Sequence, residues 1–266
     1  MSYVDIEVED IGAVRRIWHN RPAMRNAESQ NLLDELDDAL VQAGDDHAVR
    51  VVILGGRGEH FSAGHDLKES REKRNNLTVE ERYRYEQKRY LDYCLRLRDV
   101  PKPVIAQVQG ACIGGAFMVA NMCDLIVASD DAYFADPVVH SVGASAVEVL
   151  IHPWVLGERK AKEFLYTGEK IGAEEALRWG MVNRVVPRAE LEAATLTLAE
   201  RIAQAPLFAL TITKRSINRS VDIMGQRNAI LAHFDTHELS HFTEAFKSTR
   251  PASREEAVAK GRTAVA

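Results

Sequence analysis

The sequence predicts an α/β fold, with a parallel sheet in its first part and a helical C-terminal region. Residues 50–54 (RVVIL) and 104–108 (VIAQV) are near-continuous apolar runs, which is typical of strands buried on both faces of a parallel sheet. Each run is followed by a glycine-rich segment at which a strand can pass into a helix. After about residue 145 helical periodicity replaces the strand patterns, which places most helices late in the chain.

The other elements follow from periodicity and capping signals. Thr78 and Glu81 form a capping-box pattern, which predicts a long charged helix that ends at about residue 98. Leu32, Leu36 and Leu40 share one face of an earlier helix. Further strands are expected at residues 4–8, 13–18, 125–128 and 182–186. Further helices are expected at residues 114–122, 146–152, 158–166, 173–179, 189–204, 207–219 and 224–246. We divide the chain into a core (1–200) and a helical C-terminal region (201–266).

Composition narrows the class of protein. The 266 residues include 46% apolar and 27% charged residues, which is ordinary for a globular protein. The net charge of −5 provides no basic field for nucleic acid, and no apolar run is long enough to span a membrane. The first residues do not have the pattern of a secretory signal, and the three cysteines form no CxxC pair. We therefore expect a cytoplasmic protein without nucleic-acid or membrane partners.

Two segments have the composition of ligand-binding corners. Residues 61–67 (FSAGHDL) follow the first buried strand, and residues 110–116 (GACIGGA) follow the second. Small residues let the backbone approach a ligand closely, and a helix N-terminus presents unpaired N–H donors. Two such corners that face each other could bind one carbonyl oxygen as negative charge develops on it. Tight packing at two strand–helix corners would produce the same composition, so the segments alone leave both interpretations open.

The motifs of this chain resemble those of the crotonase (enoyl-CoA hydratase/isomerase) family. FSAGHDL is similar to that family's F-x-A-G-x-D-[LI] loop, and the stretch from Gly110 to Asp124 is similar to its G-x-x-x-G-G…C-D block. Further matches occur in the family's order over roughly residues 5–250. They include Asn20-Arg21-Pro22, Arg25-Asn26-Ala27, Pro101-Lys102-Pro103, Thr167-Gly168 and Gly180-Met181-Val182-Asn183.

The resemblance implies a spiral of ββα units with a helical C-terminal trimerisation region, assembled as a homotrimer or hexamer. It implies an acyl-CoA substrate and no separate cofactor, since CoA is part of the substrate. It also implies an oxyanion hole for a thioester enolate, made by the backbone N–H groups of His65 and Gly115. The implied contacts with CoA or substrate are Arg25, Ala27, Ala63, Gly64, His65, Asp66, Leu67, Gly114, Phe246 and Lys247.

The sequence departs from the family where a hydratase of this type has two glutamates. Met118 and Val138 occupy those positions, and neither side chain can transfer a proton. Asp136 and His140 are the nearest substitutes, and alternation along an extended segment would place both on the same side as Val138. Turn capping by Asp136 and an exposed loop position for His140 are the structural alternatives. Glu148 is a further candidate, for which a solvated helix position is the alternative.

Three histidines form a stripe on the last long helix. His233, His237 and His241 are four residues apart and share one helical face, an arrangement that can bind a metal. No motif places a carboxylate or cysteine beside them, so we expect no metal site.

Three functions remain open at this point. The first is an enoyl-CoA hydratase or isomerase, classed as a lyase of fatty acid metabolism. The second is another reaction on the same enolate, namely isomerisation, decarboxylation or hydrolysis of a CoA thioester, because an oxyanion hole serves many reactions. The third is an acyl-CoA-binding homologue with impaired catalysis.

Overall fold

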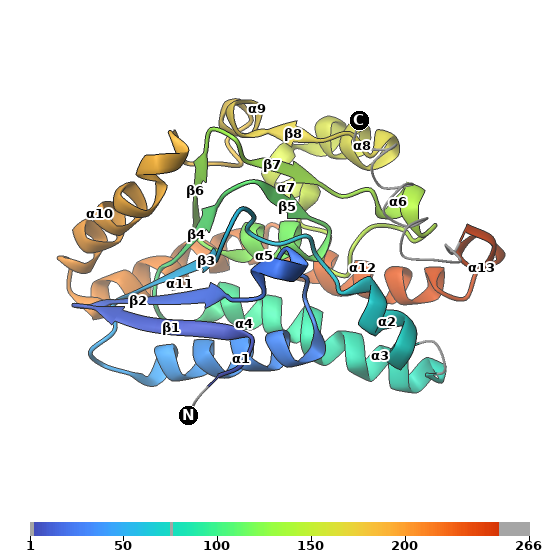
Figure 1. The fold of residues 1–266 in the computed structure, drawn as a ribbon, viewed down its shortest axis with the longest axis horizontal. Helices are drawn as coiled ribbons and strands as arrows, with labels where there is room; N and C mark the ends of the chain where they lie inside the picture. The colour runs from blue at the N-terminus through green and yellow to red at the C-terminus, as the bar shows by residue number, and fades with distance from the viewer. Residues whose placement is uncertain (1–2, 75–76, 250–266) are drawn as a thin grey trace.

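The computed structural model describes residues 3–74 and 77–249, and it confirms the α/β class with a helical C-terminal region. Six strands form one sheet in the order β1-β2-β3-β4-β6-β9 (Figure 1). Their bounds are β1 Ile6–Ile11, β2 Val14–His19, β3 Val51–Gly56, β4 Val104–Val108, β6 Leu125–Ser129 and β9 Arg184–Val186. Only β1 and β2 pair antiparallel, and the other neighbours pair parallel.

Helices cover both faces of this sheet. Val52, Leu54 and Val104 pack into a core with α1 (Gln30–Asp45), α4 (Tyr93–Asp99) and α5 (Gly115–Met122). Val51, Ile53 and Ile105 point to the opposite face, where α10 (Leu191–Ala203) covers them. Burial on both faces explains why β3 and β4 are apolar at successive positions instead of alternating.

A second, small sheet lies beside the first. It consists of β5 (Ala111–Ile113), β7 (Tyr133–Ala135) and β8 (Ile171–Gly172), and none of these strands was predicted. Strands of two or three residues are too short to show a two-residue period, which explains the omission. The sheet matters because β5 runs directly into the corner that opens α5.

Several predicted boundaries need correction. The capping box at Thr78 is confirmed, but the expected continuous helix is divided into α3 (Val79–Glu86), a π-helical turn (Gln87–Asp92) and α4. The helix predicted at residues 146–152 is wrong, because that stretch is irregular and α7 (His152–Leu156) begins only at its end. The extended segment expected around Val138 is also wrong, because α6 (Val138–Ser141) starts there.

The remaining helices lie mostly in the second half of the chain. Their bounds are α2 Leu67–Arg74, α8 Glu158–Thr167, α9 Ala173–Arg178, α11 Leu207–Ile223, α12 Gln226–Ser240 and α13 Glu244–Thr249. Short 3-10 turns occur at Pro22–Met24 and Arg188–Glu190. No described helix is both long enough and apolar enough to cross a membrane.

Helices α11 and α12 leave large apolar side chains exposed. The most exposed are Phe208, Ile217, Ile223, Met224 and Leu239. Ile230 and Phe234 of α12 are, by contrast, buried within the chain. A cavity of about 540 Å³ lies between α11 and the α5–β6 corner, and no residue of the two glycine-rich segments lines it. The packing of α11 against the rest of the chain is therefore incomplete.

Candidate active site

The two glycine-rich corners lie side by side. The Ser62 N–H donates to the Ala111 carbonyl (3.1 Å), and the Ile113 N–H donates to the Ser62 carbonyl (3.2 Å). Gly64 has a φ of +80°, and a Cβ atom there would lie 2.3 Å from the Ile113 oxygen and 3.2 Å from the Gly115 nitrogen. Only glycine fits this position, because both the backbone angle and the space exclude a side chain.

The corners present two N–H groups that are close together. Gly114, with a φ of +58°, makes Gly115 the first residue of α5, and the first N–H groups of a helix have no acceptor within the helix. His65 follows Gly64 directly, where the chain turns toward α2. Within residues 3–74 and 77–249 we find no acceptor for the N–H group of His65 or of Gly115. Both donors remain available for a ligand.

The segment from Arg25 to Ala27 lies against the first corner. The Ala63 N–H donates to the Arg25 carbonyl (2.9 Å), and the Glu28 N–H donates to the Gly64 carbonyl (2.8 Å). Arg25 and Asn26 both have a φ of +53°, so the chain turns sharply at this point. Asp66 Oδ1 accepts from the Lys68 and Glu69 N–H groups at 3.2 Å, and the carboxylate thereby caps the start of α2.

The side chain of His65 is bound between two glutamates. Its Nδ1 lies 3.0 Å from Glu28 Oε2, and its Nε2 lies 3.0 Å from both oxygens of Glu148. The Tyr90 ring packs against the imidazole at a centroid distance of 4.1 Å. Glu28 and Glu148 are buried, at 2% exposure each. Because both ring nitrogens face carboxylates, His65 is bound as a doubly protonated imidazolium.

Opposing effects act on the pKa values of this pair. Burial lowers the pKa of His65, but the ion pairs with Glu148 and Glu28 outweigh burial and raise the pKa to about 10. Burial likewise raises the pKa of Glu148, but the charge of His65 outweighs it and lowers the pKa to about 2. The imidazolium and the carboxylate are therefore both charged at neutral pH.

The sequence suggested Glu148 only as a further candidate for the acid–base group, after Asp136 and His140. The solvated helix position considered for it is wrong, because Glu148 is buried in the irregular stretch between α6 and α7. Two bonds from α12 secure the residues before it. His233 Nε2 lies 2.9 Å from the Val147 oxygen, and His237 Nδ1 lies 2.7 Å from the Ala146 oxygen.

The structure gives Asp136 and His140 separate partners. Asp136 is fully buried, and its carboxylate accepts from the Val138 and Val147 N–H groups and lies 3.1 Å from His152 Nε2. The exposed His140 has its Nε2 2.6 Å from the Tyr166 oxygen. Because α6 begins between them, Asp136 and His140 do not share one side of an extended strand as expected. The turn alternative suits Asp136, whereas His140 is exposed as expected but lies in α6 and not in a loop.

The remaining sequence candidates lie in different surroundings. Met118 is fully buried in α5, and Val138 is half-buried at the start of α6. Phe246 packs on His241, with 4.8 Å between the ring centroids, and Lys247 pairs with Glu244 at 2.7 Å. Neither of these two contacts joins Phe246 or Lys247 to the two corners within the described chain.

Comparisons with known proteins agree with this architecture. The model of the enoyl-CoA hydratase/isomerase family matches residues 9–256. A curated relative, the putative enoyl-CoA hydratase EchA13 of Mycobacterium tuberculosis, is 42% identical over 257 residues, covering 90% of this chain and 81% of its own length.

Solved structures of similar proteins have the same fold. A probable enoyl-CoA hydratase from Mycobacterium smegmatis is 49% identical with a TM-score of 0.85, and the match covers 91% of this chain and 95% of that one. An enoyl-CoA hydratase/isomerase from Xanthobacter autotrophicus Py2 is 33% identical with a TM-score of 0.91, and the match covers 98% of both chains. The resemblance inferred from the motifs and the crotonase-like fold are thereby confirmed. The chain belongs to the enoyl-CoA hydratase/isomerase family.

Proposed function

We propose that this protein is an acyl-CoA enzyme that stabilises a thioester enolate between the N–H groups of His65 and Gly115. The observation that carries the proposal is the close approach of the two corners, with a free N–H at each. Donors fixed in this way stabilise negative charge as it develops on an oxygen, and they need no reorganisation during the reaction. The family and the relatives' names support a CoA thioester as the substrate.

The CoA moiety would bind along the outer side of the first corner. The backbone of residues 63–67 and the turn at Arg25 and Ala27 form this wall, and Gly114 closes it from the second corner. Phe246 and Lys247 would reach CoA only on a neighbouring subunit, in keeping with their distance along the chain from these corners.

Proton transfer, if the reaction requires it, is assigned to the His65–Glu148 pair. Among the described residues, the carboxylates that contact the His65 ring are Glu28 and Glu148. A Cβ atom at Gly115 would lie 2.4 Å from His65 Cε1, so the ring stands directly beside the proposed oxyanion hole. Asp136 and His140 are less suitable, because the Asp136 carboxylate already accepts from two backbone N–H groups and His140 bonds to the Tyr166 oxygen.

Two classes of reaction follow from this arrangement. Hydration or isomerisation of an enoyl-CoA would use the pair to donate and recover a proton. Decarboxylation or thioester hydrolysis would use the oxyanion hole and need no glutamate at the positions of Met118 and Val138. The absence of acids at those two positions supports the second class, which does not need them.

Binding and turnover of acyl-CoAs test the function directly. We expect calorimetry to detect binding of a matched acyl-CoA and little binding of its free acid, because the proposed contacts recognise the CoA moiety and the thioester. Products from a panel of acyl-CoAs would be identified by mass. Glu148→Gln is expected to lower kcat/KM at least about tenfold, at the low end of the effect of one acid–base group. His140→Gln serves as the control and should leave the rate unchanged. Equal binding of thioester and acid would contradict the proposal.

We also propose a homotrimer or hexamer. The exposed apolar side chains of α11 and α12 support it, since Phe208 is 75% and Ile223 is 87% exposed in the single chain. Light scattering at micromolar concentration is expected to give three or six times the chain mass of 29.7 kDa. A mass equal to one chain would contradict the assembly.

A further inference from the structure

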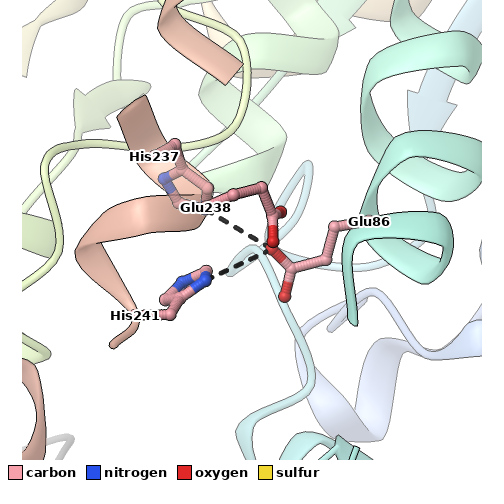
Figure 2. Close-up of side chains that lie close together, drawn as sticks. All are labelled: Glu86, His237, Glu238 and His241. Carbon is pink, nitrogen blue, oxygen red and sulfur yellow. Dashed lines mark ion pairs between the residues drawn. The ribbon is translucent and has the colours of Figure 1, made fainter. Parts of the chain in front are cut away.

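Four side chains from two helices converge beneath the proposed active site. Glu86 ends α3, His237 and Glu238 lie on α12, and His241 caps the end of α12. One nitrogen or oxygen atom of each lies within 4.8 Å of the others (Figure 2). None of these four residues has a role in the proposed reaction.

The tautomer of His237 places a ring nitrogen lone pair opposite carboxylate oxygens, which is an unfavourable contact. Its Nδ1 lies 2.7 Å from the Ala146 oxygen, so Nδ1 carries the proton and donates it. In neutral histidine, Nε2 then has a lone pair, and this lone pair faces Glu86 Oε2 at 3.5 Å and Glu148 Oε1 at 3.8 Å. Acceptors that face one another repel unless a second proton or a metal cation lies between them. A metal-bound histidine characteristically donates its other N–H to a carbonyl, as His237 does.

The other atoms of the cluster are also unsatisfied. In the described part of the chain, Glu86 Oε2, His237 Nε2, His241 Nδ1 and both oxygens of Glu238 are buried without a hydrogen-bond partner. Buried polar atoms in native proteins nearly always have a partner. A bound cation would satisfy unpartnered atoms from all four residues, since one such atom of each lies within 4.8 Å of the others.

The basic residues nearby do not fill this position. Arg82 donates to Glu86 Oε1 at 2.7 Å, and Arg74 lies 3.5 Å from the same oxygen. Both guanidinium groups therefore engage Oε1, whereas the histidines face Oε2. One oxygen of Glu86 is held by the arginines, and the other is directed into the cluster.

The distances fit zinc. Bonds of 2.0–2.1 Å in a tetrahedral site place neighbouring ligand atoms about 3.4 Å apart. Glu86 Oε2 is 3.5 Å from His237 Nε2 and 3.7 Å from His241 Nδ1, so these three atoms need only small movements to share one ion. Nitrogen and carboxylate ligands in this combination suit zinc.

The local sequence has a matching pattern. Residues 237–241 read HELSH, which is the H-E-x-x-H spacing that places two zinc-binding histidines on one helical face. A glutamate from a separate helix completes several such sites, and Glu86 occupies that position here. His233 does not take part, because its Nε2 is bonded to the Val147 oxygen.

We propose that Glu86, His237, Glu238 and His241 bind one Zn²⁺ ion. Burial of Glu86, His237 and Glu238, with His241 largely enclosed, makes this a closed site in which the protein supplies all the ligands. The ion joins α3 to α12 and adjoins Glu148 through His237, so it supports the wall behind His65.

Metal titration tests the proposal. Protein stripped with a chelator is expected to take up one Zn²⁺ per chain by calorimetry and elemental analysis, and zinc should raise Tm. Co²⁺ at the same site should give the visible absorption bands of four-coordinate cobalt. His241→Gln and Glu238→Gln are expected to weaken zinc binding by more than about 100-fold, since even groups that only orient ligands cost about 10–100-fold.

His233→Ala provides the matched control, because it removes a histidine from the same helix that is not a proposed ligand. This variant should bind zinc as tightly as the original protein. The proposal is wrong if the stripped protein takes up no zinc, in which case a second proton on His237 separates the carboxylates. It is also wrong if His241→Gln and His233→Ala bind zinc equally well, or if cobalt gives no four-coordinate bands.

Discussion

Replacing Gly115 by proline is expected to lower kcat/KM at least about 100-fold, because proline removes one of the two donors assigned to the oxyanion hole. A single donor of this kind is typically worth ~3–4 kcal/mol in the transition state. Steady-state kinetics with the best acyl-CoA substrate would measure the change, after circular dichroism had established that the variant folds.

Alanine at the same position separates the missing N–H from crowding. A Cβ atom there would lie 2.2 Å from Glu28 Oε2 and 2.4 Å from His65 Cε1, so both variants disturb the His65 side chain. Only proline also removes the donor, so the alanine variant should retain more activity. Gly172→Ala controls for the change itself, because no atom lies within 4 Å of a Cβ at Gly172. A folded proline variant that kept the rate of the original protein would place the oxyanion hole elsewhere.

His65→Ala is expected to lower the free energy of unfolding by about 3–5 kcal/mol, because it leaves two buried carboxylates without their shared cation. The N–H group of residue 65 is retained, so both donors of the proposed oxyanion hole remain, whereas the proton transfer assigned to the His65–Glu148 pair would be lost. Urea unfolding would measure the difference. His47→Ala, a change at an exposed histidine, should be nearly neutral.

The pH dependence of this difference has a defined sign. The folded-state pKa of His65, about 10, is above the ordinary value of 6.5, so protonation stabilises the fold. This contribution is complete below about pH 6.5 and is lost as the pH rises through about 10. On the acid side, the lowered pKa of Glu148 means that its contribution is lost as the pH falls from about 4.5 toward 2. The stability gap between the original protein and His65→Ala should therefore narrow at both extremes, and a constant gap would contradict the ion pairs.

Features that depend on local sequence were predictable. The apolar runs of β3 and β4, the two corners and the capping box at Thr78 each follow from a few adjacent residues. The partners of His65 were not predictable, because Glu28 and Glu148 lie far apart in the chain and only the tertiary fold brings them together. Glu148 was also misplaced on a helix, since residues 146–152 have helical composition but bond to α12 instead.

The histidine cluster illustrates a different limit. The HELSH spacing is present in the sequence, and its two histidines, His237 and His241, also belong to the even stripe with His233, for which we expected no metal site. The proposed cluster adds Glu86, at the end of α3, and no spacing rule connects this residue with α12. A residue such as Glu86 can be matched with the histidines of α12 only when the folded structure is known.

The bonds from α12 to the Ala146–Val147 backbone have a consequence for the division of the chain at residue 200. Glu148 follows these two residues directly, so a helix of the C-terminal region determines where this carboxylate stands. Removal of α12 would release the stretch that carries Glu148 and leave His65 with Glu28 alone. The α/β sheet is thus not a separate module to which the helices are appended, and a shortened chain that still folded would lack the contacts that position the proposed His65–Glu148 pair.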